Sequence, residues 1–575
     1  MLVPKNDGNG RTIDRLETAL WRGQIDRRKF VQLAIASGFS ALAADAVAQD
    51  AAAVQRNQRS LAENLKGAYD YIVCGAGSSG SVVARRLAQD TSKQILLLEA
   101  GGTDDSPSIL APLQWYMNVG SERDWGYMTE PSPALNGRSI AMPMGKALGG
   151  GSSINAMVWA RGHKNDFDGW ADLAKDPNWS YEHVLGIYRR IEDWQGPADE
   201  KRRGKGGLVW VAPAKDPSPL APAMVQAADS IGITAYDDQN GAMMEGVGGC
   251  AIANLRIRDG RRANIPASYL HPVMGQPNLT VLTGAQVRRV VLSGKKATSV
   301  EFIWNGGVRK IDAGREIILS MGAIQTPHVL MLSGIGDQAE LKRVGLEVVH
   351  HLPGVGQNFQ DHTMVGGCVW EPNEAIPARN NSAEATFFWK SDASIPTPDL
   401  QPFLIEIPYV SEVTGPQFKP PASCWSIAPG IVRPKSRGYL KLRSNRPDDK
   451  IAVFANSLQE KADVDVLIRG IELVRELGNS AVMKPFVKRE AVPGPLKGAE
   501  LEAFVRNGAV SYFHATCTCK MGHDDMAVVD NNLKIRGIDN LRIADGSIMP
   551  DVTTGNTMAP CVVIGERLAE ILAIA

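Results

Sequence analysis

The chain has few cysteines, no net charge and no long hydrophobic run. Seven cysteines in 575 residues are too few for the disulfide framework of a small secreted scaffold. Lysine plus arginine and aspartate plus glutamate both number 62, so the formal charge is zero. A neutral chain without a basic block lacks the electrostatic footprint of a nucleic-acid-binding protein. An uncharged stretch over residues 31–44 is shorter than the ~20 residues of a membrane span, so we expect no stable span.

The amino-acid composition is typical of a folded globular protein. Hydrophobic residues make up 44% and charged residues 22%, which is usual for a globular chain. The length allows three or four domains, or equally a two-domain α/β enzyme. Glycine is abundant, at 57 of 575 residues against a usual ~7%. We therefore expect the backbone to approach another group closely at several places.

The first fifty residues contain the pattern of an export signal. A charged segment, residues 26–29 (DRRK), precedes the uncharged stretch 31–44, and an A-x-A site follows at 46–48. Such a pattern is typical of a cleavable signal, and the paired arginines indicate the twin-arginine route. The alternative is an N-terminal amphipathic helix. We predict an export signal over residues 1–48, a tether over 49–68 and a periplasmic location.

A glycine-rich turn follows a predicted strand near residue 75. Residues 69–74 (YDYIVC) form a short, β-branched apolar run that predicts a buried strand. The run leads directly into a G-x-G-x-x-G pattern at Gly75, Gly77 and Gly80. Gly75 permits the tight turn, Gly77 lets the backbone approach a pyrophosphate, and Gly80 lets helix and strand pack closely.

The residues after this turn complete a dinucleotide-binding pattern. A helical stretch over 81–87 precedes a second predicted strand, 94–98, which ends at Glu99. The helix N-terminus supplies a positive dipole for a phosphate, and Glu99 can accept hydrogen bonds from ribose hydroxyls. The pattern predicts dinucleotide binding but does not separate FAD from NAD.

Further segments carry a resemblance to a known family. A glycine-dense loop, 145–151, leads into a helix-like run, and a predicted strand, 316–319, leads into the segment 322–336. With 353–362, 514–522 and 545–557, these segments resemble the signature segments of the glucose–methanol–choline (GMC) oxidoreductases, flavoenzymes that oxidise alcohols. The resemblance runs from about residue 69 to the end, and it is nearest to choline-dehydrogenase-like and related bacterial alcohol dehydrogenases.

The resemblance implies an α/β (α+β) architecture of two domains. A Rossmann-like FAD-binding domain is expected to be discontinuous, because its segments lie at both ends and in the middle of the chain. We expect it over 69–160, 220–335 and 526–575. A sheet-and-helix substrate domain is expected over 161–219 and 336–525, with strands at 403–409 and 436–442.

The resemblance also implies the cofactor and its contacts. Some members attach FAD covalently through a histidine in the glycine-loop segment, but Ile154 stands at that position here, so we expect non-covalent FAD. No metal is expected, because Cys517-Thr-Cys519 lacks C-x-x-C spacing and a second pair. The residues implied to contact FAD are Gly75, Gly77, Ser79, Gly80, Glu99, Gly149, Gly150, Ser153, Asn155, Ala156, Val287, Asp545, Gly546, Asn556 and Thr557.

The chemistry needs a base and a hydrogen-bond donor. Alcohol oxidation by hydride transfer requires loss of the hydroxyl proton, and an imidazole with a pKa near ~6.5 suits that task. The developing alkoxide also needs a preorganised donor. The resemblance implies His514 as the base, Asn556 as the donor and flavin N5 as the hydride acceptor. The histidines left structural or unassigned are His350, His351, His362 and His523.

The substrate side leaves alternatives open. Glu406 lies in a strand that the resemblance places near the pocket, where it would meet a cationic alcohol such as choline; the alternative is a surface or cross-strand charge. Tyr512 and Phe513 precede His514 and either border the flavin or pack in the core. We predict oxidation of a primary alcohol, aromatic alcohols and polyols included, with electrons passing to a quinone or cytochrome c. The alternatives are an alcohol oxidase that produces hydrogen peroxide and a flavin-containing hydroxynitrile lyase.

Overall fold

The computed structural model describes residue 16, residues 27–36 and residues 53–572. Helix α2 spans Arg27–Ala36, where the paired arginines and the start of the apolar stretch lie. The predicted A-x-A site at 46–48 lies outside the described residues. Within the described ranges, no helix is both long enough and apolar enough to cross a membrane.

The first sheet has a parallel centre formed by five strands. β1 (Ala68–Cys74) lies between β2 (Ile95–Leu98) and the C-terminal half of β14 (Gly307–Leu319), which confirms the predicted strand at 69–74. β11 (Leu279–Leu282) pairs with β2 and β27 (Leu541–Ile543) pairs with β14, both in parallel. Because helices cover the two faces of a parallel sheet, β2 and β11 are buried along their whole length rather than alternating.

An antiparallel extension widens this sheet on one side. The N-terminal half of β14 pairs with β13 (Lys296–Trp304), which pairs with β12 (Gln286–Ser293). This extension places Val287, near the start of β12, beside the end of the parallel strands.

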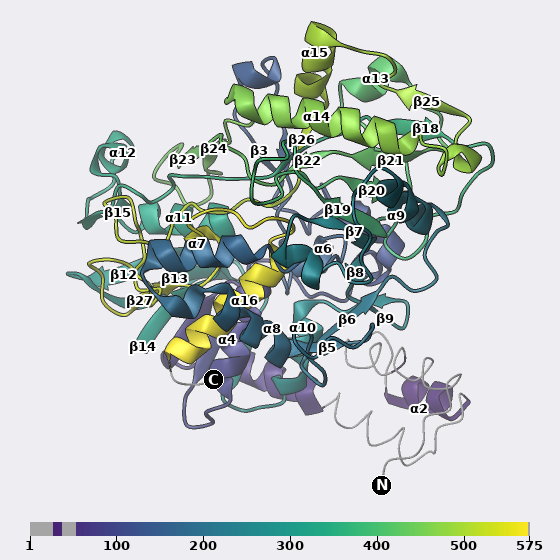
Figure 1. Cartoon of the computed structure of the whole chain (residues 1–575). Helices are drawn as coiled ribbons and strands as arrows, with labels where there is room; N and C mark the ends of the chain where they lie inside the picture. Colours follow the sequence, from purple (N-terminus) through teal and green to yellow (C-terminus); the bar gives the residue numbers. More distant parts are fainter. Residues whose placement is uncertain (1–15, 17–26, 37–52, 573–575) are drawn as a thin grey trace.

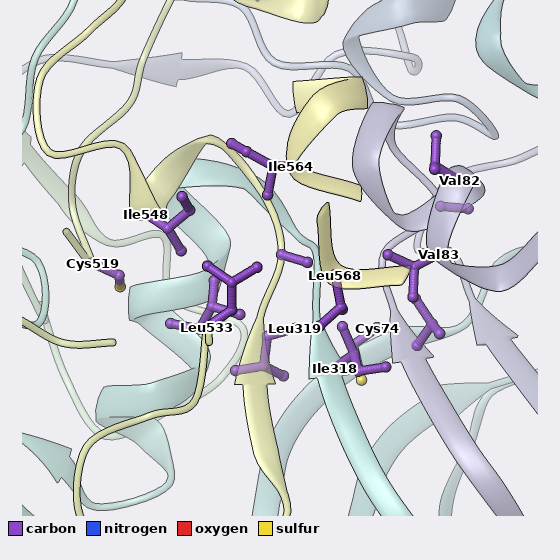
Figure 2. Close-up of a cluster of buried hydrophobic side chains, with 14 of the residues drawn as sticks. Cys74, Val82, Val83, Ile318, Leu319, Cys519, Leu533, Ile548, Ile564 and Leu568 are labelled. Carbon is purple, nitrogen blue, oxygen red and sulfur yellow. The ribbon is translucent and has the colours of Figure 1, made fainter. Parts of the chain in front are cut away.

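Two helices from opposite ends of the chain pack on this sheet side by side. α4 (Ser78–Ala88) follows β1 near the start of the folded chain, and α16 (Met558–Ile571) is the last helix that the structure describes (Figure 1). A Cβ at Gly565 would lie 2.8 Å from Cβ of Val82, so the glycine lets the two helices approach closely. Figure 2 shows Val82, Ile564 and Leu568 in one buried cluster with strand residues such as Ile318.

The second sheet is antiparallel. Its strands, in spatial order, are β25 (Arg489–Val492), β18 (Val369–Glu371), β21 (Trp425–Ala428), β20 (Phe403–Ile405), β19 (Ala385–Phe388) and β7 (Gly249–Ile252). α14 (Lys461–Gly478) and α9 (Leu220–Ser230) cover one face, and α15 (Gly498–Gly508) packs on α14 (Figure 1). Leu404 of β20 joins the cluster under α14, whereas Phe403 and Ile405 point to the opposite face, because successive side chains of a strand alternate.

The other described elements are shorter or lie between the sheets. The helices are α5 (Pro107–Leu110), η1 (Pro112–Asn118), η2 (Pro133–Leu135), α6 (Gly151–Ile154), α7 (Lys164–Ala174), η3 (Pro177–Trp179), α8 (Tyr181–Ile191), η4 (Ala242–Glu245), α10 (Ile265–Tyr269), η5 (His271–Val273), α11 (Gly322–Leu332), α12 (Gln338–Arg343), α13 (Thr414–Phe418), η6 (Lys484–Phe486) and η7 (Gly546–Ile548). The strands are β3 (Tyr127–Met128), β4 (Ala141–Met142), β5 (Glu192–Trp194), β6 (Val209–Pro213), β8 (Asn254–Leu255), β9 (Ile257–Arg258), β10 (Arg261–Arg262), β15 (Ile335–Gly336), β16 (His350–His351), β17 (Thr363–Val365), β22 (Gly430–Ile431), β23 (Tyr439–Lys441), β24 (Ala452–Phe454) and β26 (Ala509–Ser511).

The packing of some elements differs from the predicted domain ranges. α7 and α8 lie within the range predicted for the substrate domain, but their apolar faces join the core of the first sheet. α9 and β7 lie within a range predicted for FAD binding, but they belong to the second sheet. The sequence of an amphipathic helix shows that one face must be buried, but it does not show which sheet or helix that face packs against. The predicted strand 403–409 is shorter in the structure, because β20 ends at Ile405 and the next N–H, of Glu406, donates to the carbonyl of Ser382 instead.

Candidate active site

A cavity of about 400 Å³ lies between the two sheets. Four parallel strands, β1, β2, β14 and β27, run towards it, and each is followed within two residues by a lining residue. These are Gly75, Glu99, Ser320 and Asp545. The carboxyl ends of parallel strands are where α/β sheets bind their ligands, so this edge is the expected place for a nucleotide.

Helix N-termini also face the cavity. α4 begins at Ser78 and α16 begins at Met558, and both residues line the cavity. The unpaired N–H groups and the dipole at a helix N-terminus favour a negatively charged group. Two such termini at one cavity match the diphosphate of a dinucleotide.

The three glycines of the first turn have separate tasks. Gly75 has a φ of +96°, and a Cβ there would lie 2.4 Å from the carbonyl oxygen of Ser320. A Cβ at Gly80 would lie 1.9 Å from the carbonyl oxygen of Gly75. At Gly77, by contrast, the nearest atom to a Cβ is the Ser320 oxygen at 3.9 Å, and the residue lines the cavity. Gly75 and Gly80 therefore serve the fold, whereas Gly77 leaves room for a ligand.

Glu99 closes the nucleotide end of the cavity. Its carboxylate accepts hydrogen bonds from the backbone N–H groups of Ala76, at 3.0 Å, and Gly101, at 2.8 Å. Burial raises the pKa of Glu99 to about 7. The carboxylate oxygens retain lone pairs for ribose hydroxyls, so the residues present at this end fit the adenosine half of FAD.

Most of the residues predicted to contact FAD line the cavity, and three do not. The predicted residues that line it are Gly75, Gly77, Ser79, Glu99, Gly150, Asn155, Ala156, Val287, Asp545, Gly546, Asn556 and Thr557. Gly80, Gly149 and Ser153 instead shape the two glycine-rich turns; the Ser153 hydroxyl, for example, donates to the carbonyl of Leu148 at 2.6 Å. Ile154 lines the cavity with an apolar side chain.

His514 and Asn556 meet at the other end of the cavity. The amide Nδ2 of Asn556 lies 3.2 Å from Nε2 of His514, although the residues are 42 positions apart. His514 follows β26, and Asn556 lies just before α16. Burial lowers the pKa of His514 to about 3, so its imidazole is neutral and able to accept a proton.

Asp361 holds the backbone at His514. One oxygen of its carboxylate accepts from the His514 backbone N–H at 2.8 Å, and the other accepts from the Ser511 hydroxyl at 2.6 Å. Between them, Phe513 adopts a left-handed φ of +68°. Asp361 precedes β17, which pairs with β26, so the strand pairing brings the carboxylate to the turn.

Two residues to which the sequence assigned no role contact the predicted catalytic pair. Nδ1 of His362 lies 2.9 Å from Nδ1 of His514, and the Gln401 amide donates to Oδ1 of Asn556 at 3.1 Å. For His362 there was a signal, because it is adjacent to Asp361 in a segment that carries the family resemblance. Gln401 carries no local signal, since only the second sheet brings it to Asn556.

The cavity wall near His514 is apolar. Its lining includes a group of packed side chains that we call the wall cluster, which comprises Val158, Met364, Ala383, Phe403, Ile405 and Tyr512. The Tyr512 ring lies 5.0 Å from the His514 ring, and Phe513 also lines the cavity. Both aromatic residues that precede His514 therefore face the cavity.

Glu406 does not line the cavity, so of its two alternative roles the contact with a cationic alcohol is not the one found. Its side chain accepts from the backbone N–H of Arg379 at 2.9 Å and lies against Glu384. Burial and the neighbouring Glu384 raise the pKa of Glu406 to about 9, so the carboxyl is protonated and neutral at pH 7. The physical reason is the strand alternation, since Phe403 and Ile405 take the cavity face. Among the described lining residues, the carboxylates are Glu99 and Asp545, both at the nucleotide end.

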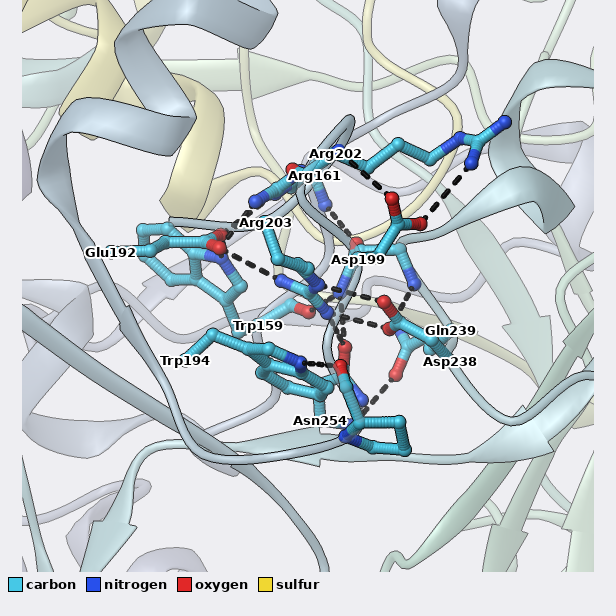
Figure 3. Close-up of polar contacts among 12 residues, drawn as sticks. Trp159, Arg161, Glu192, Trp194, Asp199, Arg202, Arg203, Asp238, Gln239 and Asn254 are labelled. Atoms are coloured by element: carbon cyan, nitrogen blue, oxygen red, sulfur yellow. Dashed lines mark hydrogen bonds and ion pairs between the residues drawn. The ribbon is translucent and has the colours of Figure 1, made fainter. Parts of the chain in front are cut away.

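A buried polar network holds the chain segment behind the cavity. Glu192 accepts from Trp159 at 2.6 Å and forms an ion pair with Arg161, and Arg203 bridges Glu192 and Asp238 (Figure 3). Burial alone would raise the pKa of Glu192, but the two guanidinium groups lower it. The network ties residues 159–161 to β5, and Val158 of the wall cluster immediately precedes them.

Comparison with known proteins identifies the family. A family model described as GMC oxidoreductase matches residues 69–364, and the C-terminal GMC oxidoreductase model matches residues 434–565. The chain belongs to the GMC oxidoreductase family. It is 36% identical to mouse mitochondrial choline dehydrogenase over 551 residues, covering 89% of this chain and 91% of the relative. It is also 36% identical to alcohol dehydrogenase [acceptor] of Pseudomonas putida, covering 88% of this chain and 95% of the relative.

Solved structures share the fold. Pyridoxine 4-oxidase from Mesorbium loti has a TM-score of 0.83 and 32% identity, covering 87% of this chain and 98% of that one. A formate oxidase variant from Aspergillus oryzae, studied for FAD modification, has a TM-score of 0.80 and 25% identity, covering 88% and 99%. This GMC oxidoreductase is therefore a two-domain, FAD-dependent enzyme that oxidises CH–OH groups of alcohols. The expected fold class, enzyme class and cofactor are confirmed.

Proposed function

We propose that this enzyme oxidises neutral, apolar primary alcohols, aromatic ones included, to aldehydes and passes the electrons to a quinone or a cytochrome. The observation that supports this is the position of His514 and Asn556 beside the wall cluster. An apolar wall stabilises an apolar or aromatic substrate by burying its surface. Polyols are disfavoured, because their hydroxyls would lose hydration without gaining partners there.

The described residues account for the proton transfer. FAD, when bound, supplies the group that accepts a hydride from the alcohol carbon. Nε2 of His514 takes the hydroxyl proton, and Nδ2 of Asn556 donates to the alcohol oxygen. The two side-chain atoms are 3.2 Å apart, so one hydroxyl can contact both. The apolar wall excludes water and keeps the imidazole neutral until it receives that proton.

Choline is a second candidate, because relatives of this chain are named choline dehydrogenase. The exclusion of Glu406 from the cavity counts against a carboxylate partner for the ammonium group. The rings of Tyr409, Tyr512 and Phe513 line the cavity, however, and aromatic faces attract quaternary ammonium ions.

An anaerobic flavin-reduction assay tests the proposal. Benzyl alcohol, choline and glycerol are each mixed with the FAD-bound enzyme, and the flavin absorbance near ~450 nm is followed. We expect benzyl alcohol to bleach the flavin fastest. Fastest bleaching by choline would support the second candidate. Persistent colour with every alcohol, together with cleavage of a cyanohydrin, would overturn the proposal in favour of a lyase.

The electron acceptor is tested separately. One relative is named alcohol dehydrogenase [acceptor], and another, from Paraburkholderia xenovorans, oxygen-dependent choline dehydrogenase. We expect fast reduction of a quinone or a redox dye in the absence of air and little hydrogen peroxide in air. Peroxide formed at the rate of alcohol oxidation would identify an oxidase instead.

We also propose that the enzyme is exported to the periplasm by the twin-arginine route. The support is the sequence pattern at residues 26–48, together with the need to load FAD in a folded protein before export. Replacing Arg27 and Arg28 by lysine should retain the enzyme in the cytoplasm, as measured by cell fractionation. Unchanged periplasmic activity would contradict the proposal.

A further inference from the structure

A row of three hydrogen bonds passes through the catalytic pair. The Gln401 amide nitrogen lies 3.1 Å from Oδ1 of Asn556, and Nδ2 of Asn556 lies 3.2 Å from Nε2 of His514. On the far side of the same ring, Nδ1 of His514 lies 2.9 Å from Nδ1 of His362. The last contact joins two ring nitrogens, so one of them must carry the hydrogen and the other must accept it.

Which of the two histidines donates the hydrogen bond between them decides whether His514 can act as a base. If His514 carries its hydrogen on Nδ1 and donates to His362, Nε2 has a lone pair that accepts from Nδ2 of Asn556 and faces the cavity. If His362 donates instead, a neutral His514 carries its hydrogen on Nε2 and cannot take a proton from an alcohol there. The protein must therefore select one tautomer of His514.

The Asn556 amide selects the first direction. Its Oδ1 accepts from Gln401, so Nδ2 is the atom that faces His514 and donates to Nε2, which must then carry a lone pair. The His362 ring is fully buried, and its Nε2 has no hydrogen-bond partner among the described residues. With its hydrogen on Nε2, a neutral His362 presents only a lone pair at Nδ1, which accepts from His514.

The charged and titratable neighbours keep His362 neutral. Burial, then His514 and Arg433, lower the pKa of His362 well below its usual value. The Asp361 carboxylate is already occupied by the backbone N–H of His514 and the hydroxyl of Ser511. The Tyr512 ring packs edge-on at 6.4 Å from the His362 ring, and burial keeps its hydroxyl un-ionised.

We propose that His362 is a positioning residue, which holds the hydrogen of His514 on Nδ1 and so leaves Nε2 free to take the proton of the alcohol. The inference rests on the proposed role of His514 as the base. It has a second consequence, because a protonated His514 still donates from Nδ1 to neutral His362. This hydrogen bond becomes charge-assisted and stabilises the imidazolium form.

Two substitutions separate this role from simple packing. His362→Leu removes the acceptor, whereas His362→Asn keeps a polar oxygen or nitrogen on Cγ, in the place of Nδ1. At saturating alcohol without air, His362→Leu should slow flavin reduction about 10-fold or more. It should also shift the acidic limb of the pH profile to lower pH, because the imidazolium loses its acceptor. His362→Asn should recover most of the rate and the profile.

The controls exclude an indirect loss. Replacement of an exposed histidine, His351→Leu, should leave rate and profile unchanged. FAD content and far-ultraviolet circular dichroism should match the wild type in every variant compared. A His362→Leu enzyme with the wild-type rate and pH profile would overturn the proposal, as would a His362→Asn enzyme that is correctly folded and as slow as the leucine variant.

A spectroscopic measurement tests the tautomer without turnover. Imidazole ¹⁵N spectra of the FAD-bound protein should show the hydrogen of His514 on Nδ1, with the signals assigned by their loss in His514→Ala. A hydrogen on Nε2 in the wild type would overturn the inference even if alcohol reduces the flavin. Conversely, a hydrogen on Nδ1 in an enzyme that no alcohol reduces would leave the inference standing while the proposed function failed.

Discussion

Burial sets the protonation state of the ionisable side chains around the cavity. It lowers the pKa of the His514 imidazole to about 3 and raises the pKa of the Asp361 carboxyl to about 7. In both cases burial favours the neutral form of the side chain, because an apolar environment destabilises a charge of either sign. Burial therefore keeps the His514 imidazole in the neutral form, which is the form that the proposed base requires.

The first prediction concerns His514. Replacing His514 by alanine should lower the rate of flavin reduction by alcohol about 100-fold or more, the usual size of a general-base contribution, while FAD remains bound. Stopped-flow absorbance gives the rate, and the absorbance ratio of flavin to protein gives the FAD content. His351→Ala, at an exposed position, is the control. A His514→Ala enzyme that reduces its flavin at the wild-type rate would show that another group is the base.

The second prediction concerns Glu406 and pH. Its folded-state pKa of about 9 lies above the ~4.3 of an unfolded chain. A carboxyl whose pKa is raised by folding stabilises the protein fully when the pH is below its pKa in the unfolded chain. This stabilisation is lost as the pH rises through its pKa in the folded protein. Glutamine does not ionise, so Glu406→Gln removes this loss. As the pH rises from 5 to 9, the free energy of unfolding of the variant should increase by about 1 kcal/mol or more relative to that of the wild type.

Urea unfolding at a series of pH values measures this difference. Glu374→Gln, at an exposed position, should follow the wild-type pH dependence. If Glu406→Gln keeps the same slope of stability against pH as the wild type, the Glu406 carboxyl is ionised in the folded protein.

At the scale of elements, two helices from opposite ends of the sequence present their N-termini to one ligand. α4 starts directly after the first glycine-rich turn, and α16 starts directly after Asn556 and Thr557. The close packing of the two helices, allowed by Gly565, places the donor amide near the diphosphate site. The same short segment thus links cofactor binding to the reacting pair.

The third prediction tests the turn before α4. Gly77→Val should fold normally, because no atom lies closer than 3.9 Å to the new Cβ, yet it should lose FAD, because the side chain would occupy the approach of the diphosphate. Circular dichroism measures folding, and the flavin absorbance of the purified protein measures binding. Gly67→Val, at an exposed glycine with nothing within 4 Å, should keep its flavin. Full flavin content in Gly77→Val would place the diphosphate elsewhere.

At the scale of the whole molecule, the cavity joins the two sheets. Its walls include the turns after the parallel strands on one side and Phe403 and Ile405 of the antiparallel sheet on the other. A ligand held between two layers stabilises both, because it binds only the folded arrangement. The wide separation of the lining residues in sequence means that the site forms only when the whole fold has formed.

The fourth prediction follows from that arrangement. At a free FAD concentration about 100 times the dissociation constant, the free energy of unfolding should rise by about 2.7 kcal/mol relative to the FAD-free protein. Thermal unfolding followed by circular dichroism, with and without added FAD, measures the shift. The Gly77→Val variant should show no shift. An equal shift in that variant would indicate that FAD stabilises the protein without occupying the cavity.

The sequence by itself determined the family and the glycine-rich turn of the nucleotide-binding half, and it predicted His514 and Asn556 as the reacting pair. The turn at Gly75, Gly77 and Gly80 and the segments around His514 and Asn556 are contiguous, and local backbone geometry and family resemblance both act on contiguous residues. Only the tertiary structure decided which face of β20 meets the cavity, which core receives α7 and α8, and which side chains support the catalytic pair. His362 and Gln401 contact residues more than 150 positions away, and Glu406 contacts Arg379 and Glu384 in a neighbouring segment; no local pattern records these contacts.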